Sequence, residues 1–345
     1  MLWFDLDNSP HVPLFRPILA ELGKRKVPCV VTARDFAQTK ELLSLWGIPH
    51  TVIGAHGGGG RTQKVLNLLQ RSAALKKAMH EAPIRLAVSH GSRTQVLASW
   101  RMGLPSLVML DYEYTESRVF NYFGTRIAVP AAIPDRRLRD AGFNLKKVIR
   151  YDGFKEEIYL DDFVPTGGFR RQIGVAENSI LVTMRPPSTT GNYHDPRSEE
   201  LFRACLDRFS SYPGVHILVI QRTSAESSLI PDTLRAQGNV SVLPRAVDGL
   251  QLVWHSDIVV SGGGTMNRES ALLGTPTFSI FTGRRPYLDE YLHSQGKLRF
   301  IENPEQVTSI PVVKRTIPSS FTCSNPGLAS RISDLIISLA QGSDS

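Results

Sequence analysis

Residues 255–276, HSDIVVSGGGTMNRESALLGTP, combine in one stretch the residue types that bind a phosphorylated ligand. The β-branched run at 258–260 is typical of a buried parallel strand, and three consecutive glycines then predict a tight turn. Thr265 is placed to cap a following helix, which Gly274 ends and Pro276 prevents from continuing. A strand, a glycine turn and a helix start together form an anion site, because N–H groups and the positive end of the helix dipole point at the ligand.

The side chains around this turn indicate what the ligand is. We expect Arg268 and Glu269 in the first helical turn, where a carboxylate can accept two hydrogen bonds from a ribose diol. The alternative is an ordinary βα turn without a ligand. Three glycines with a helix-start Glu favour a nucleotide site, and its predicted contacts are Gly262, Gly263, Gly264, Thr265, Asn267, Arg268 and Glu269.

Candidate catalytic groups lie in the first half of the chain. His11 closes the first β–loop–α unit, and an unperturbed imidazole titrates near neutral pH, so His11 is our predicted general base. The alternative is a histidine that caps or packs at a helix start. Asp111 and Glu113 follow a predicted strand at 106–110, and there they could act as the base or bind acceptor hydroxyls.

Other polar residues at strand ends are candidate ligand contacts. Asn8 follows the first strand, and Ser92, two residues after His90, could bind a phosphate or hydroxyl. Arg185 could pair with a diphosphate, because a guanidinium binds phosphate in a bidentate manner. Arg284 and Arg285 fit the same role, but a solvated loop pair is the favoured interpretation, and solvent exposure is favoured for His194.

Strand-like and helix-like runs alternate along the whole chain, which predicts parallel sheets with helices on both faces. The predicted strands are 2–6, 28–32, 50–53, 86–89, 106–110, 125–129, 180–183, 215–220, 240–243, 258–260 and 277–280. The predicted helices are 14–25, 36–45, 62–79, 94–102, 199–209, 227–237, 248–255, 266–273 and 327–340.

The length of 345 residues and the restart of the pattern after residue 153 predict two Rossmann-like, doubly wound domains. We expect an N-terminal domain at 1–153, a C-terminal domain at 154–325, and a final helix and tail at 326–345. The glycines at 57–60 are expected to form a linker or a lid.

The net charge of +8 is unevenly distributed. Residues 1–150 carry 22 Lys and Arg against 11 Asp and Glu, whereas residues 151–345 carry 18 against 21. A basic first half predicts an anionic partner, such as a phosphorylated substrate or an anionic membrane surface, unless it is only a soluble basic face. No RNA-binding motif or interleaving of basic and aromatic residues is present, so no nucleic-acid partner is expected.

The apolar stretches, the first residues and the cysteines indicate the cellular compartment and whether a metal is expected. No stretch approaches the length of a membrane span, and the first residues lack the features of a signal peptide, so we expect a cytoplasmic protein, with peripheral contact at the inner membrane face as an option. Cys29, Cys205 and Cys323 are far apart and lack metal-ligand spacing, so we expect neither a structural metal nor a cofactor.

These motifs resemble those of the nucleotide-sugar enzymes of the GT-B fold, which include glycosyltransferases and UDP-N-acetylglucosamine 2-epimerase. The resemblance is strongest over 240–276: Glu269 falls on the Glu that binds the donor ribose, the glycines fall on the diphosphate turn, and Arg245 and Ala246 fall in the base-binding loop. His11 matches the His of the first loop of a peptidoglycan glycosyltransferase. The whole pattern, over residues 1 to about 310, is similar to a bacterial and archaeal family of unknown function with this fold.

The sequence departs from the epimerases at two catalytic positions. Their His-Arg-Arg-Glu-Asn segment is Met184-Arg185-Pro186-Pro187-Ser188 here, so its His has no counterpart. Their His-Gly-Asp is His90-Gly91-Ser92, so its Asp is also lost. Residues 111–116, which contain Glu113, lie near their His-x-Glu-Ala-Gly. Both losses count against epimerisation by that mechanism.

The resemblance therefore implies a metal-independent hexosyl or N-acetylhexosaminyl transferase. In such an enzyme the two domains face a cleft. The C-terminal domain at 154–325 would bind a nucleoside-diphosphate sugar, with UDP the expected carrier, and the N-terminal domain at 1–153 would bind the anionic or lipid-linked acceptor that is glycosylated. The alternatives are a UDP-N-acetylglucosamine 2-epimerase-like enzyme and a non-catalytic protein that binds a nucleotide sugar. A phosphatase of the haloacid dehalogenase type, suggested by Asp5 and Asp7, lacks the later acidic pair after 258–260.

Overall fold

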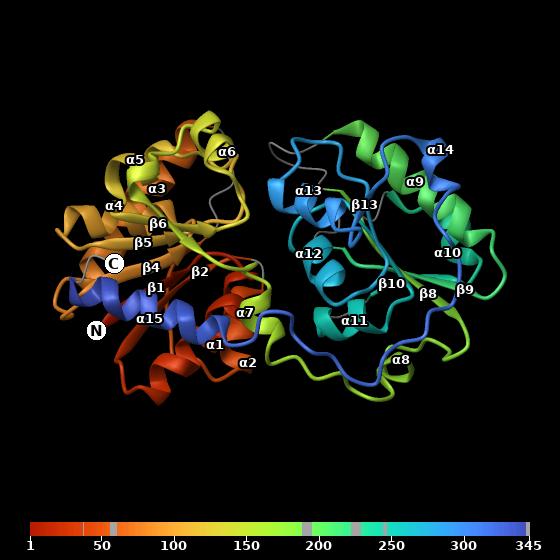
Figure 1. Cartoon of the computed structure of the whole chain (residues 1–345), viewed down its shortest axis with the longest axis horizontal. Helices are drawn as coiled ribbons and strands as arrows, with labels where there is room; N and C mark the ends of the chain where they lie inside the picture. Colours follow the sequence, from red (N-terminus) through yellow and green to blue (C-terminus); the bar gives the residue numbers. More distant parts are fainter. Residues whose placement is uncertain (37, 56–60, 188–194, 222–228, 244–246, 343–345) are drawn as a thin grey trace. The chain divides into compact units, whose positions relative to one another are not determined.

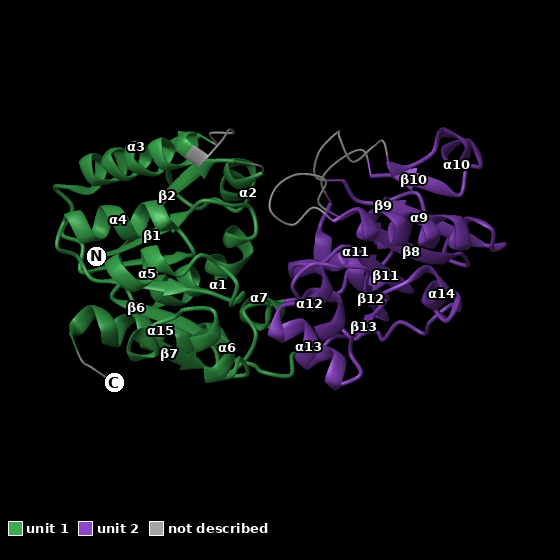
Figure 2. Ribbon diagram, turned by 90° about the horizontal axis from the view of Figure 1, so that it is seen from above, with its two compact units in different colours: residues 1–162, 323–345 green, residues 163–322 purple. Residues whose placement is uncertain are grey.

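The computed structural model describes residues 1–345 except 37, 56–60, 188–194, 222–228, 244–246 and 343–345. The chain forms two compact units, coloured separately in Figure 2: residues 1–162 with 323–345, and residues 163–322. The sequence pattern placed the boundary at 153/154 and a separate segment at 326–345. In the structure the chain enters the second unit at 163 and returns to the first at 323.

The first unit is a seven-stranded parallel sheet with helices on both faces (Figure 1). Its strand order is β3-β2-β1-β4-β5-β6-β7. The strands are β1 (Leu2–Leu6), β2 (Cys29–Asp35), β3 (Thr51–Ala55), β4 (Leu86–His90), β5 (Ser106–Met109), β6 (Arg126–Pro130) and β7 (Val148–Tyr151). The helices are α1 (His11–Lys24), α2 (Thr39–Leu45), α3 (Arg61–Met79), α4 (Arg93–Arg101), α5 (Arg118–Phe123), α6 (Asp135–Asp140), η1 (Leu145–Lys147), α7 (Glu157–Leu160) and α15 (Leu328–Gln341).

The second unit repeats this architecture with six parallel strands in the order β10-β9-β8-β11-β12-β13. Its strands are β8 (Ile180–Arg185), β9 (Val215–Val219), β10 (Val240–Val242), β11 (Ile258–Ser261), β12 (Thr277–Ser279) and β13 (Arg299–Phe300). Its helices are α8 (Phe169–Gln172), α9 (Pro196–Ser210), α10 (Asp232–Ala236), α11 (Gly249–His255), α12 (Thr265–Leu272), α13 (Tyr287–Ser294) and α14 (Pro304–Val307).

The predicted doubly wound α/β architecture is confirmed, and every predicted strand is present. Two strands were not predicted, because β7 is mostly half-buried and lacks a continuous apolar run, and β13 has only two residues. The helix predicted at 227–237 begins only at Asp232, and Pro231 is its N-cap. Strand β1 shows why the sheet forms: all five residues are buried, with Phe4 packed in one core cluster and Trp3 in another.

A buried ion pair lies at the centre of the first unit. Arg71 on α3 donates two hydrogen bonds of 2.8 Å to the two carboxylate oxygens of Asp5 on β1. The hydroxyls of Thr32 and Ser92 also donate to Asp5, at 2.7 and 2.6 Å. Arg71 donates a further bond of 2.9 Å to the carbonyl oxygen of Ile53 on β3. This network joins three strands to α3 and to the start of α4.

Substitution Asp5→Asn is expected to lower the free energy of unfolding by about 3–5 kcal/mol, because it leaves the Arg71 guanidinium buried without its carboxylate. The matched control is Asp35→Asn, since Asp35 forms an exposed ion pair of 2.9 Å with Lys40 and should contribute less than about 1 kcal/mol. Chemical denaturation of both variants measures the difference. Equal losses would show that burial of the first pair carries no special weight.

Candidate functional site

The glycine turn of the second unit lies at the carboxyl end of β11, beside the end of β8. The strand order of the sheet reverses direction between these two strands, and ligands of doubly wound sheets bind at such a point. A Cβ on Gly262 would lie 2.5 Å from the Cα of Pro187, so the two loops approach as only glycine allows. Gly263 and Gly264 have φ angles of +104° and +86°, which also favour glycine.

Helix α12 begins at this turn, with Gly264 as its N-cap. The expectation that Thr265 is the N-cap is wrong: Thr265 is the first helical residue, and the N-cap, Gly264, has no side chain that could accept a capping hydrogen bond. Glu269 is the fifth residue of α12, not a first-turn residue as expected, and it is half-buried. Thr265 and Glu269 are one turn apart and share a face of the helix.

Asn267 and Arg268 point into the fold. Asn267 is fully buried, and its Nδ2 donates to the Ser279 hydroxyl at 3.0 Å. Arg268 is buried and donates from Nη1 to Asp289 on α13 at 3.1 Å. The two residues that the sequence suggested as ligand contacts therefore attach α12 to β12 and α13.

The arginines proposed for the diphosphate differ in their positions. Arg185 ends β8, pairs in register with Ser261 and is half-buried, so it lies at the turn. Its backbone oxygen accepts a bond of 3.1 Å from the N–H of Gly262. Arg284 is exposed, and Arg285 pairs with Glu302 and stacks on the Phe300 ring. Arg245, Ala246 and His194 lie outside the described residues.

In the first unit, His11 is the first residue of α1, directly after the loop that follows β1. It is 8% exposed, and its Nδ1 lies 3.2 Å from Oδ1 of Asp7. Burial raises the pKa of Asp7, but the close contact with the His11 imidazole and the charges of Arg71 and Arg34 outweigh it, so the pKa is lowered overall. An ionised Asp7 is placed to fix the orientation and tautomer of the imidazole.

A second histidine lies beside the first, at the point where this sheet also reverses its strand order. His90 ends β4, and its ring centroid is 4.9 Å from that of His11. Its Nε2 lies 3.2 Å from Oδ1 of Asp111, whose other oxygen contacts the ammonium group of Lys155. Burial lowers the pKa of His90, and the charges of Lys155 and His11 act in the same direction against the opposing effect of Asp111.

The structure thus brings His11, His90, Asp7 and Asp111 together from β1, β4 and β5. Lys155 was not predicted as part of the site. The sequence gives little indication of its role, because its partner Asp111 lies 44 residues away. Buried lysines are rare, so the burial of Lys155 in the structure identifies it as a residue of the site. Glu156, which is fully buried, lies 3.6 Å from Lys155.

The other predicted contacts of this unit have different environments. Ser92 is fully buried, and its hydroxyl donates to Asp5. As the N-cap of α4, the same hydroxyl accepts a bond of 3.3 Å from the N–H of Gln95. Asn8 is half-buried and accepts a bond of 2.9 Å from the N–H of Ser9, which shapes the loop before His11. Glu113 is buried, two residues after Asp111.

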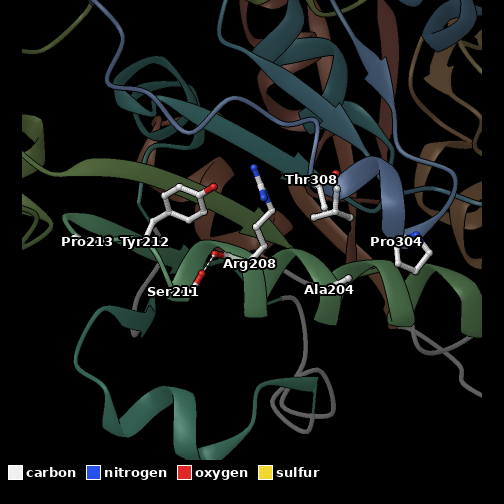
Figure 3. A pocket seen from close by; sticks show the side chains of 8 residues that line it. Ala204, Arg208, Ser211, Tyr212, Pro213, Pro304 and Thr308 are labelled. Carbon is white, nitrogen blue, oxygen red and sulfur yellow. Dashed lines mark hydrogen bonds between the residues drawn. The ribbon is translucent and has the colours of Figure 1, made fainter.

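A cavity of about 520 Å³ lies elsewhere in the second unit, between α9 and α14 (Figure 3). It is lined by Arg208 and Tyr212, and by Pro213 just before β9, so it lies at the amino end of the sheet rather than at the glycine turn. The Arg208 guanidinium stacks on Tyr212 and donates to the Ile310 carbonyl. Among the described residues, no group of three or more His, Cys, Asp or Glu side chains could hold a metal ion.

Comparison with known proteins places the chain in a family. Residues 1–314 match the family described as "Protein of unknown function (DUF354)". The chain belongs to this family. An uncharacterized protein from Methanocaldococcus jannaschii is 23% identical over 306 residues, which are 86% of each chain.

Solved structures with the same fold are also found. UDP-GlcNAc 2-epimerase from Neisseria meningitidis bound to UDP-GlcNAc has a TM-score of 0.75 and 12% identity, over 97% of this chain and 99% of that one. Anabaena HepE in complex with UDP and glucose has a TM-score of 0.55 and 19% identity, over 81% and 80%. At these identities the likeness shows the fold, which is the two-domain Rossmann-like fold of the GT-B class, as the motifs predicted.

The environment of His90 predicts a pH-dependent stability. Because its pKa is lowered in the folded protein, the unfolded chain binds the proton more tightly, and wild-type stability should fall as the pH drops below the ordinary value of 6.5. In His90→Gln this decline should be smaller. Thermal unfolding between pH 7.5 and 5 compares the two, and parallel curves would contradict the lowered pKa of His90; His80→Gln, at an exposed position of the same unit, serves as the matched control.

Proposed function

We propose that this protein is a glycosyltransferase of the GT-B fold that uses a nucleoside-diphosphate sugar. The second unit would bind the donor, and the first would bind an anionic or lipid-linked acceptor. UDP is the proposed carrier, because the Neisseria and Anabaena structures of the same fold are described with UDP-GlcNAc and with UDP. The reaction proposed is transfer of a hexosyl or N-acetylhexosaminyl group.

The observation that carries the proposal is the glycine turn at the reversal point of the second sheet. There the N-cap of α12 is Gly264, which has no side chain, so backbone N–H groups and the helix dipole would favour a diphosphate. Arg185 lies at the end of the neighbouring strand and would add a cation. Glu269, on the same helix face as Thr265, would accept hydrogen bonds from the donor ribose.

In the first unit the proposed base is His11. Asp7 lies 3.2 Å from its Nδ1, which leaves Nε2 as the nitrogen that takes the proton from the acceptor hydroxyl. The acceptor oxygen forms a bond to the anomeric carbon while the bond from that carbon to the diphosphate oxygen breaks. The electron pair leaves with the diphosphate, whose charge the turn and Arg185 would neutralise. His90 and Asp111 would orient the acceptor.

Epimerisation of the nucleotide sugar is the second candidate. It is favoured by the extent of the fold likeness to the Neisseria epimerase and by the burial of Glu113 near the position suggested by the sequence. It is disfavoured at Ser92, which stands where the epimerases have Asp and whose hydroxyl is hydrogen-bonded to Asp5. A binding protein without activity would have the same donor site.

Nucleotide binding is the first test. A saturating UDP-sugar at about a hundredfold excess over Kd should stabilise the protein by about 2.7 kcal/mol, and Glu269→Ala should remove most of this shift because the ribose contact is lost. Thermal shifts with UDP, GDP, ADP, dTDP and CMP identify the base. Glu305→Ala, an exposed residue of α14, is the matched control. If no nucleotide stabilises the wild type at millimolar concentration, the donor site is refuted.

The proposed base is tested with the donor so identified. His11→Ala should lower kcat by about 10²–10⁴-fold, the usual contribution of a general base. Asp7→Asn should lower kcat with little change in KM, because it alters the orientation of the imidazole rather than substrate binding. Product analysis separates a transferred sugar from an epimerised nucleotide sugar. Donor binding without any turnover by the wild type would support the binding-protein alternative.

A further inference from the structure

Helices α3, α4 and α5 cover one side of the first unit's sheet, whereas α1, α2 and α15 cover the other (Figure 1). We call the solvent-facing surface of α3, α4 and α5 the α3–α4–α5 face. Figure 2 shows α3 lying outside α4 at the edge of this unit. The helix packs on α4 and β3 through buried residues such as Leu75 and Met79.

The charge on the two sides differs sharply. The sequences of α3, α4 and α5 contain eight Lys and Arg and no Asp or Glu, whereas α1, α2 and α15 contain four basic and three acidic residues. Of the eight, Arg71 is neutralised in the core by Asp5. Lys64 and Lys77 are exposed on α3, and Arg93 and Arg101 are exposed on α4. Of the two sets of helices that cover this sheet, α3, α4 and α5 therefore carry the larger excess of positive charge.

The same face exposes large apolar side chains. Val65, Leu66 and Leu69 on α3 are 55%, 50% and 40% exposed, and their spacing of three and four residues gives a stripe outside the buried face of the helix. Trp100 at the end of α4 is 54% exposed, and Tyr122 on α5 is 77% exposed. Exposed aliphatic residues and cations on one helix, with exposed aromatic rings on the neighbouring helices, are features of surfaces that lie in a membrane interface.

The presence of both cations and apolar side chains on the α3–α4–α5 face indicates which kind of partner binds there. A nucleic acid would use the cations but would not bury Val65, Leu66 and Leu69. A second copy of the chain would bring the same positive face against itself, which repels. An anionic lipid surface satisfies both features, since it attracts each Lys or Arg near it and apolar side chains enter the acyl boundary.

We propose that the α3–α4–α5 face docks on an anionic lipid bilayer, with Val65, Leu66 and Leu69 entering the headgroup region and Lys76 and Lys77, which follow on the same side of α3, facing lipid phosphates. No helix of the described residues is long and apolar enough to cross a membrane, so the contact would be peripheral. The proposal does not rest on nucleotide-sugar chemistry. Vesicle binding measured without any nucleotide tests membrane docking separately from the proposed glycosyltransferase activity.

The test is co-sedimentation of the full chain with phosphatidylglycerol-containing vesicles at low salt, beside vesicles of phosphatidylcholine alone. The wild type should bind the anionic vesicles and should be released as salt is raised. The triple variant Val65→Ser/Leu66→Ser/Leu69→Ser should bind at least about tenfold more weakly, because three aliphatic side chains no longer enter the interface. The variant Lys76→Glu/Lys77→Glu should show a similar loss.

Matched controls come from the opposite side of the same unit. Leu45→Ser on α2, where Leu45 is 74% exposed, and Lys24→Glu at the end of α1 should leave vesicle binding unchanged. Thermal unfolding checks that each variant is folded. Absence of wild-type binding to anionic vesicles overturns the proposal, as does equal binding by the triple variant. A dimer of the wild type that the triple variant converts to a monomer, with no vesicle binding, would show a second copy as the occupant.

Discussion

The buried pair of Asp5 and Arg71 is the constraint on which the first unit depends. A charge in the core is tolerated only with a partner, so α3 must lie where Arg71 reaches β1. Asp5 also accepts a hydrogen bond from Ser92, the N-cap of α4, which lies two residues after His90 at the end of β4. Asp7 and His11 lie just beyond the end of β1, the strand that contains Asp5. The network therefore fixes the carboxyl ends of β1 and β4, and with them the two histidine rings.

The second unit uses a buried carboxylate at the opposite end of its central strands. Asp257, just before β11, accepts hydrogen bonds from Arg170 at 2.9 Å, from the N–H of Leu181 in β8 at 2.7 Å and from the N–H of Arg315 at 3.0 Å. It ties β8 and β11 where they begin. At their carboxyl ends the two strands are joined instead by backbone, through the bond from Gly262 to Arg185. The proposed ligand site is thus built mainly of main-chain groups.

The sequence predicts features that depend on neighbouring residues better than contacts between residues far apart in the chain. Buried parallel strands are continuous apolar runs and the glycine turn is a local pattern, so both sheets and the turn were predictable. Ser92, Asn267 and Arg268 were assigned to ligands because they lie near strand ends or helix starts. Their actual partners are 12 to 87 residues away, and no local pattern encodes such pairings. The contact of Lys155 with Asp111 was missed for the same reason.

The return of the chain to the first unit has a consequence for biosynthesis. Helix α15 covers α1 with Leu328, Ile332 and Ile336, and Ser324 donates a bond of 2.8 Å to Glu157. On the ribosome, the second unit is synthesised in full before this helix exists. The second unit can therefore finish folding before the first is complete, and the part of α1 that α15 covers stays exposed until that helix has been synthesised.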